Sequence, residues 1–167
     1  LTSGSTTTLV PVKSASNAGC FTPLFNDRTN IITDPYCNNL SNFSGWGARS
    51  IETSYVYCGS RSVKVSGRCG GSLDFSLNGK IEPNKTYRVK AMISTNGTGE
   101  VKIGLSGAAD ALITQPISTA AGEWLPLVFN FKAGSTLNNP LMYFNSCETQ
   151  TATEMYIDNW EMYDVTD

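Results

Sequence analysis

Apolar and polar residues alternate along several short stretches of this chain. The clearest stretch is 86–94, in which every second residue from Tyr87 to Ile93 is apolar. A period of two places these side chains on one face of an extended strand and turns Arg88 and Lys90 to the other face. Segments rich in Gly, Pro and Asn bound the stretch on both sides, which predicts a strand between two turns.

Runs of the same kind recur along the rest of the chain, at residues 62–65, 72–77, 100–105, 124–132, 141–145 and 154–163. No helical pattern lies between them, and spacings of roughly ten to fifteen residues are typical of antiparallel sandwiches and barrels. The sequence therefore predicts an all-β domain. We expect its core to contain Tyr87, Val89, Ile93, Val101, Ile103, Trp124, Phe129, Phe131, Ile157 and Trp160.

The chain has room for one full-sized domain, because it contains 167 residues. Residues 1–19 are rich in Ser and Thr, which is typical of a linker or an extension from a preceding module. From residue 20 onward the strand pattern begins, so we expect the domain to occupy residues 20–167.

The low charge of the chain limits the kinds of molecule that it can bind. Only 16% of the residues are charged and the formal net charge is −2, so the chain lacks the basic surface that nucleic acid requires. It also lacks an apolar run of about 18 residues, so we expect no membrane-spanning segment.

Five cysteines and no histidine exclude a zinc site of Cys and His ligands. Cys58 and Cys69 flank a short segment that could fold back on itself, which favours a disulfide between them. The alternative is that all five cysteines are small buried apolar residues.

Several short sequence motifs occur along the chain in the same order as in a known protein family. They are Asn-Ile-Ile-Thr-Asp-Pro-Tyr-Cys-Asn at 30–38, Gly45-Trp46, Gly-Ser-Arg-Ser-Val-Lys-Val at 59–65, a Pro-x-x-x-Tyr-x-Val segment at 83–89, Gly-Glu-Trp at 122–124 and Tyr-Ile-Asp-Asn at 156–159. Together they resemble the carbohydrate-binding modules of families 4, 9, 16 and 22.

The resemblance implies a jelly-roll β-sandwich that binds a polysaccharide and tethers an attached polysaccharide-degrading enzyme to its substrate. It also implies a secreted or cell-surface protein of bacterial origin that is itself no enzyme. We expect the isolated domain to be a monomer.

Two positions depart from the family pattern. The glutamate that often helps to hold a structural calcium in this group falls at Asn38, whereas the second ligand, Asp158, is present. A neutral carbonyl is a poorer calcium ligand than a carboxylate. The tryptophan that several members carry after the 59–65 motif is missing, because residues 67–71 read Gly-Arg-Cys-Gly-Gly.

Recognition of a sugar requires flat rings for its C–H face and planar polar groups for its hydroxyls. We interpret Trp46, Trp124 and Trp160 as core residues, and Tyr55 and Tyr57 as better platforms. The polar candidates, which we expect on the groove side of neighbouring strands, are Asp74, Arg88, Lys90, Asn130 and Asn145. Two cations in a groove favour an acidic polysaccharide, although Arg88 and Lys90 could equally solvate an exposed sheet face.

Two other classes of function remain open. A glycoside hydrolase needs two carboxylates about 5 to 10 Å apart, and no motif here marks such a pair. Catalysis by a Ser-His-Asp or Cys-His arrangement is excluded because the chain has no histidine. The runner-up is a structural or adhesive β-sandwich module, which the Ser/Thr-rich head and the missing tryptophan favour.

Overall fold

The computed structural model describes residues 23–66, 72–109, 113–146 and 153–167, with the side chains of 113–118 and of residue 146 left out. The predicted linker, residues 1–19, lies outside these ranges. The described residues form nine strands and one short 3-10 helix, η1 (Leu40–Asn42). The strands are β1 (Ala48–Glu52), β2 (Ser62–Ser66), β3 (Ser72–Ser76), β4 (Thr86–Thr95), β5 (Gly99–Ser106), β6 (Ile113–Thr119), β7 (Leu125–Lys132), β8 (Leu141–Ser146) and β9 (Glu154–Asp164).

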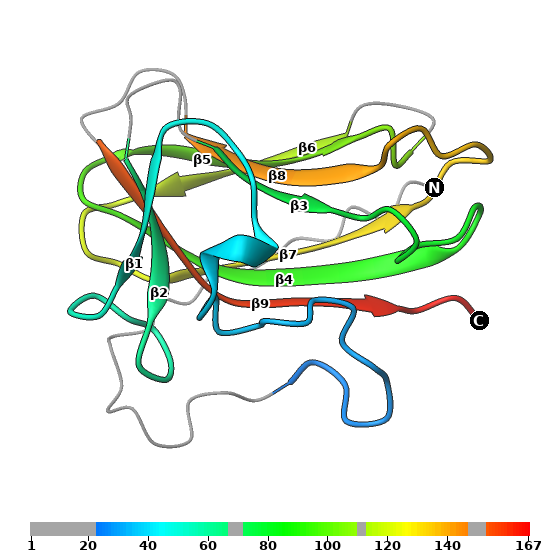
Figure 1. The fold of residues 1–167 in the computed structure, drawn as a ribbon, viewed down its shortest axis with the longest axis horizontal. Coiled ribbons are helices and arrows are strands. Elements are labelled where there is room, and N and C mark those ends of the chain that lie inside the picture. Colours follow the sequence, from blue (N-terminus) through cyan, green and yellow to red (C-terminus); the bar gives the residue numbers. More distant parts are fainter. Residues whose placement is uncertain (1–22, 67–71, 110–112, 147–152) are drawn as a thin grey trace, which may run out of the picture.

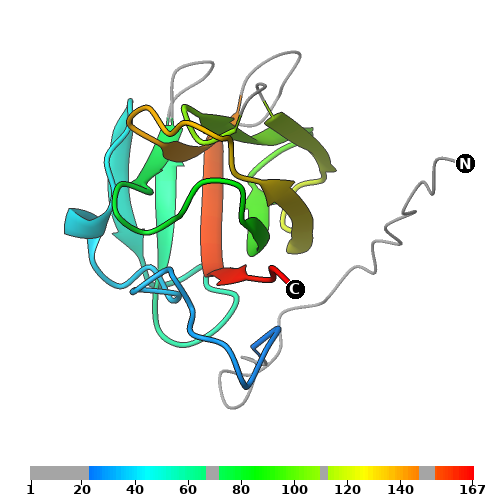
Figure 2. The ribbon, with the colours of Figure 1, turned by 90° about the vertical axis from the view of Figure 1, so that its right-hand side faces the viewer.

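These strands form two antiparallel sheets. One sheet has the order β1-β2-β9-β4-β7 and the other has the order β3-β8-β5-β6. Figure 1 shows the two sheets as layers, with β4, β7 and β9 in one and β3, β5, β6 and β8 in the other, and Figure 2 shows the same layers after a quarter turn. The jelly-roll sandwich predicted from the sequence is confirmed.

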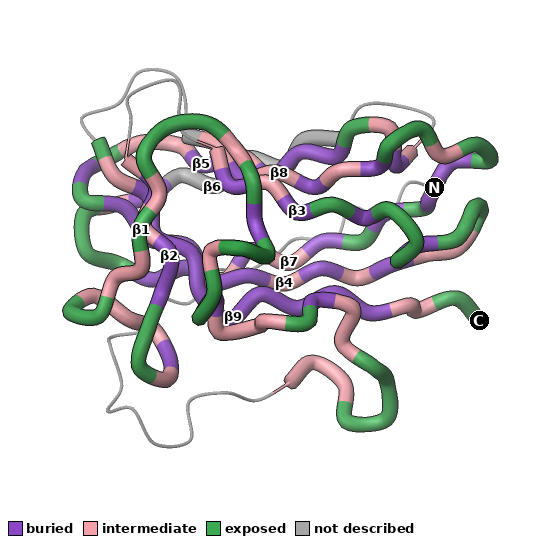
Figure 3. Tube along the Cα trace, viewed as in Figure 1, coloured by how far each residue is buried: buried purple, intermediate pink, exposed green. Residues whose placement is uncertain are grey.

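All seven predicted strands are present, each within two residues of its expected bounds. The prediction missed β1 and β6, which are edge strands of the two sheets. Along β3 and β7 buried residues alternate with more exposed ones, as the colours of Figure 3 show.

The core lies between the sheets, and Trp160 of β9 joins them. Its ring is 5.4 Å from that of Phe75 on β3 and 4.6 Å from that of Phe144 on β8, both edge to face. Phe43 stacks on it from the segment before β1, at 5.6 Å. Every predicted core residue except Trp124 belongs to this cluster.

A bulge in β9 brings Trp160 into the core. The pairing with β4 shifts between Lys90 and Met92, and Asn159 adopts a φ of 51°, in the left-handed region. The extra residue allows both Ile157 and Trp160 to point inward, although they are an odd number of residues apart.

The predicted pairing of Cys58 with Cys69 rested on a segment that folds back on itself. Residues 62–66 between the two cysteines form the extended strand β2, and the pairing itself stays a prediction. Cys58 is disulfide-bonded, whereas Cys37 is a buried free thiol. Cys69 lies outside the described residues, as do Cys20 and Cys147.

Candidate functional site

The sandwich has two outer faces, and side chains from elsewhere in the chain cover one of them. We call the outer side of the five-stranded sheet, including Met92, Trp124 and Tyr156, the covered face. These three buried residues form a second apolar cluster, against which the half-buried Tyr55 and Tyr57 pack. Tyr55 stacks on Trp124 at 5.4 Å, and its hydroxyl lies 2.9 Å from Oγ of Ser94. The rings of both predicted tyrosine platforms therefore pack against Trp124 and remain half-buried.

At the other end of the covered face, a buried carboxylate holds the segment that precedes the strands. Glu161 has no exposed surface. Its Oε1 lies 3.2 Å from Nζ of Lys90, and its Oε2 accepts hydrogen bonds from the Leu24 backbone N–H at 2.9 Å and the Tyr163 hydroxyl at 2.8 Å. Lys90 is thus paired with a buried charge on its own sheet.

Arg88 is engaged on the same face. Its Nε donates to Oδ1 of Asn130 at 2.8 Å, and its guanidinium lies 6.0 Å from the centre of the Phe25 ring. The same ring packs edge to face on Tyr163, with centroids 5.2 Å apart. Arg88 and Asn130 do share a face, as expected, but they bind each other there.

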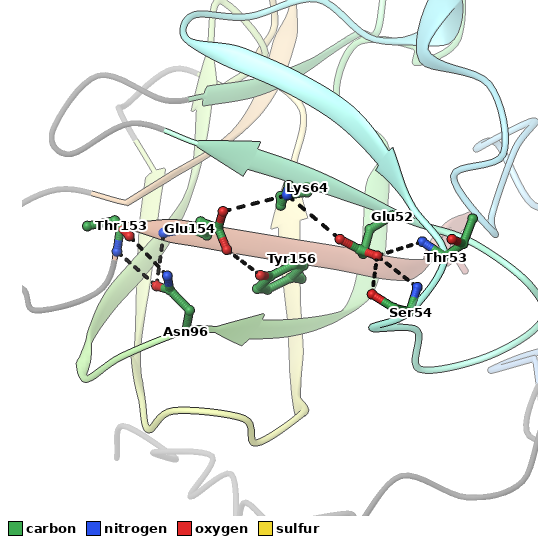
Figure 4. A network of polar contacts seen from close by, with 8 residues as sticks. All are labelled: Glu52, Thr53, Ser54, Lys64, Asn96, Thr153, Glu154 and Tyr156. Carbon is green, nitrogen blue, oxygen red and sulfur yellow. Dashed lines mark hydrogen bonds and ion pairs between the residues drawn. The ribbon is translucent and has the colours of Figure 1, made fainter.

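Three further charged residues, Glu52, Lys64 and Glu154, contact one another in the network of Figure 4. Nζ of Lys64 lies 3.7 Å from Oε2 of Glu52 and 3.6 Å from Oε1 of Glu154, whose other oxygen accepts from the Tyr156 hydroxyl. Hydrogen bonds from the Ser54 hydroxyl and backbone lower the pKa of Glu52 to about 2. This network is self-contained and stabilises the joint between β1, β2 and β9.

The outer side of β3, β8, β5 and β6 is different, and we call it the open face. Leu73 and Phe75 point into the core from β3, and Phe144 does so from β8. Alternation therefore turns Asp74, Tyr143 and Asn145 outward, and all three are half-exposed. The open face carries two of the predicted site residues, Asp74 and Asn145.

A tyrosine ring lies flat on the open face, beside a glycine that makes room for it. Tyr143 pairs with Gly104 across β8 and β5. A Cβ on Gly104 would lie 2.0 Å from Cζ of Tyr143 and 2.2 Å from its Oη, so the ring lies against the backbone of β5. The result is a flat, half-exposed aromatic surface that the sequence analysis did not identify.

Polar groups without partners flank this ring. Oδ1 of Asp74 and Oδ1 of Asn145 are buried atoms that have no hydrogen-bond partner in the described part of the chain. Asp74 pairs with Tyr143 across the two strands, and Asn145 lies between Ser72 and Lys102. An unsatisfied buried acceptor costs about 1–3 kcal/mol. A hydroxyl or water donor would therefore be stabilising here, and it reaches these oxygens when the half-exposed side chains of Asp74 and Asn145 turn toward it.

Trp46 lies at the edge of the same sheet. Its backbone N–H donates to Oγ of Ser72 at 3.1 Å and its carbonyl accepts from the Ser72 N–H at 3.0 Å. The side chain is 76% exposed. Among the described residues, no other large apolar side chain is exposed. The prediction that Trp46 is a core residue is wrong, whereas Trp124 and Trp160 are buried as expected.

Comparison with known proteins identifies the kind of domain that carries this face. Residues 22–152 match the family model of the carbohydrate-binding modules of groups 4 and 9, described as a carbohydrate binding domain. The chain belongs to this family. No curated protein matches the module in sequence.

Solved structures share the fold of the module at low sequence identity. A xylan-binding module of family 22 from Paenibacillus barcinonensis Xyn10C is 13% identical, with a TM-score of 0.62 over 74% of this chain and 87% of that one. Carbohydrate-binding module 2 of family 16 is 16% identical, with a TM-score of 0.59 over 81% of this chain and all of that one.

A larger neighbour contains an attached enzyme. The family 22 and catalytic modules of Clostridium thermocellum Xyn10B, solved with xylohexaose, match at 15% identity and a TM-score of 0.65. The match covers 80% of this chain and 28% of that protein. At these identities the likeness shows the fold.

The seven predicted binding residues of the module divide between its two faces. Asp74 and Asn145 lie on the open face, whereas Tyr55, Tyr57, Arg88, Lys90 and Asn130 belong to the covered face. The expectation that the polar candidates share one groove is therefore wrong. The pattern gives the face that a side chain takes on its own strand, but not the sheet to which that strand belongs.

The two predicted metal ligands, Asn38 and Asp158, have different surroundings. Asp158 is fully buried, and its oxygens accept from the backbone N–H groups of Tyr57 at 3.0 Å, Cys58 at 2.8 Å and Asn159 at 2.7 Å. The Asn38 amide is exposed and donates to Asp34. The described residues contain no cluster of three Cys, Asp or Glu side chains around a metal-sized space. These residues do not fit a calcium held by Asn38 and Asp158, so calcium stays a prediction that requires a direct test.

We expect the stability of the module to fall as the pH rises from about 4 to about 7. Burial raises the pKa of Asp158 from 3.8 to about 7, although three backbone hydrogen bonds act against the shift. The folded protein then binds a proton that the unfolded chain has lost, and the loss of stability across this range is on the order of 4 kcal/mol. Urea unfolding in EDTA at several pH values measures it.

The matched variant is Asp158→Asn, which has no charge to bury. It should be less stable overall, because its amide nitrogen faces a backbone donor, and should lack the part of the slope between pH 4 and 7 that belongs to Asp158. Equal slopes in the two proteins would contradict the raised pKa. Stabilisation of the wild type by CaCl₂, but not of the variant, would establish calcium binding against the geometry.

Proposed function

We propose that the module binds a polysaccharide chain on its open face. The observation that carries this proposal is the flat ring of Tyr143 over Gly104, between the unpartnered oxygens of Asp74 and Asn145. A sugar presents an apolar C–H face that packs on such a ring, and hydroxyls that donate to such oxygens. On the covered face, by contrast, Tyr55 and Tyr57 pack on Trp124, and Arg88 and Lys90 bind Asn130 and Glu161.

We propose a neutral polysaccharide rather than an acidic one. The expectation of an acidic ligand rested on Arg88 and Lys90, which bind Asn130 and Glu161 on the covered face. The open face presents the carboxylate of Asp74, which would repel a uronic acid. Its lysine, Lys102, lies 3.3 Å from Glu100. A xylan-type chain is a suitable first candidate, because the structural neighbours include xylan-binding modules.

Each hydroxyl exchanges a bond with water for a bond with protein, so we expect modest affinity, in the micromolar to millimolar range. The benefit is tethering. A catalytic module attached to this one would meet its substrate at a high effective concentration. We accordingly propose a secreted, non-catalytic accessory module. Among the described residues no helix has the length and apolarity needed to cross a membrane.

Affinity gel electrophoresis tests the proposal. The panel contains neutral polysaccharides (xylan, laminarin, glucomannan and cellulose derivatives) and acidic ones (alginate and pectin). We expect retardation by a neutral polysaccharide, equal with and without EDTA. Retardation by the acidic ones alone would overturn the neutral assignment. A folded protein that none of them retards would favour the alternative function, a structural or adhesive module.

A further inference from the structure

We propose that Trp46 is a second aromatic platform of the open face and holds a sugar ring beyond the one on Tyr143. This inference rests on the proposed function and extends it from one sugar to a stretch of chain. The first observation is exposure. A tryptophan that is 76% exposed leaves its large apolar surface in water, while the other two in the chain are at most 2% exposed.

The second observation is that the backbone of Trp46 is held firmly. Two hydrogen bonds join it to Ser72, and Ser44 forms a bridge with Asp74 two residues earlier. Gly45 between them has a φ of 130°, and a Cβ there would lie 2.1 Å from the carbonyl oxygen of Ser72. This close approach needs a glycine. A platform on a fixed backbone loses little entropy when a ligand binds.

The third observation is the place of Trp46 in the register. Ser72 pairs with Asn145, and Asn145 pairs with Lys102, so Trp46 begins a row that crosses the sheet through Asn145. Ser44, Asp74, Tyr143 and Gly104 form the neighbouring row. The unpartnered oxygens of Asp74 and Asn145 therefore lie between the two aromatic residues.

The spacing of the two residues favours a chain over a single sugar. A strand separation of about 4.8 Å and a rise of about 3.4 Å per residue place the Cα atoms of Trp46 and Tyr143 about 12 Å apart. The Tyr143 ring leans over β5, away from Trp46. One sugar ring cannot reach both platforms, so Trp46 should add affinity only for oligosaccharides long enough to span them.

Fluorescence quenching tests the contact directly, because Trp124 and Trp160 are buried and acrylamide reaches Trp46 first. The probes are the hexasaccharide and the disaccharide of the polysaccharide that retards the wild type, which are xylohexaose and xylobiose in the case of xylan. The hexasaccharide should protect the exposed tryptophan from acrylamide. The disaccharide should give less protection.

Trp46→Ala should weaken hexasaccharide binding by about tenfold and leave disaccharide binding unchanged. Trp46→Phe, which keeps a ring, should retain most of the affinity. Since the side chain is exposed, neither substitution should alter the urea midpoint. Unchanged hexasaccharide affinity in Trp46→Ala, with no protection in the wild type, would overturn the role of Trp46 while binding persists. A different result would contradict the proposed function itself: the wild type would bind no polysaccharide.

Discussion

Tyr143→Ala is expected to weaken binding of the retarding polysaccharide by about 10- to 100-fold, from the loss of stacking and of apolar contact area. The fold should survive, because the ring lies on the outer side of β8 while Phe144 beside it fills the core. Isothermal titration calorimetry with the hexasaccharide measures the change. Tyr143→Phe is the matched control, which keeps the flat ring and should stay within a few-fold of the wild type.

Gly104→Ala tests the same platform while Tyr143 itself stays unchanged. The new Cβ would lie 2.0 Å from Cζ of Tyr143, so the ring must tilt away from the sheet. Because the group that moves is the end of a side chain, we expect little loss of stability together with a clear loss of affinity. If Tyr143→Ala and Gly104→Ala both bind like the wild type, the sugar does not lie on the open face.

Lys90→Met is expected to reduce the free energy of unfolding by about 3–5 kcal/mol, because it leaves the buried carboxylate of Glu161 without its cation. Glu161 would keep its two other hydrogen bonds, from Leu24 and Tyr163. Urea denaturation at neutral pH measures the loss. Binding to the polysaccharide should be unchanged under conditions where the variant is folded, since Lys90 lies on the covered face.

The double variant Lys90→Met with Glu161→Gln separates the charge from the packing. Glutamine keeps one oxygen for Leu24 and Tyr163 and has no charge to bury, so the double variant should be more stable than Lys90→Met alone. A loss below about 1 kcal/mol in the single variant would mean that the pair behaves as a surface ion pair. A loss of binding would restore Lys90 to the binding site.

The sequence predicts the strands well where one face is buried and turn residues bound the run. It misses β1, because none of the five residues of Ala48–Glu52 is buried and the period of two is lost. It misses β6 because Pro116 interrupts the run, and proline is tolerated in this way on edge strands. Both are edge strands, where the demands of packing on the sequence are weakest.

The choice of face depends on contacts between distant parts of the chain. Leu24 reaches Glu161 across 137 residues, and Tyr55 reaches Ser94 across 39. No local pattern contains these contacts, so Arg88 and Lys90 look like groove residues from the alternation of their own strand. Trp46 is the opposite case. A tryptophan is usually buried in a core, and its exposure follows from the pairing of its backbone with Ser72 at the sheet edge.

The attachment of both ends of the described domain to the five-stranded layer also determines how the module is oriented relative to whatever is joined to it. Leu24 is bound to Glu161, and at the other end Val165 donates to the carbonyl of Thr86 on β4, so both ends of the described domain attach to the five-stranded layer. The open face lies on the opposite layer, away from both ends of the described domain. A neighbouring module or a solid support joined through either end would therefore start from the layer opposite the proposed binding face, which leaves Tyr143 and Trp46 facing outward.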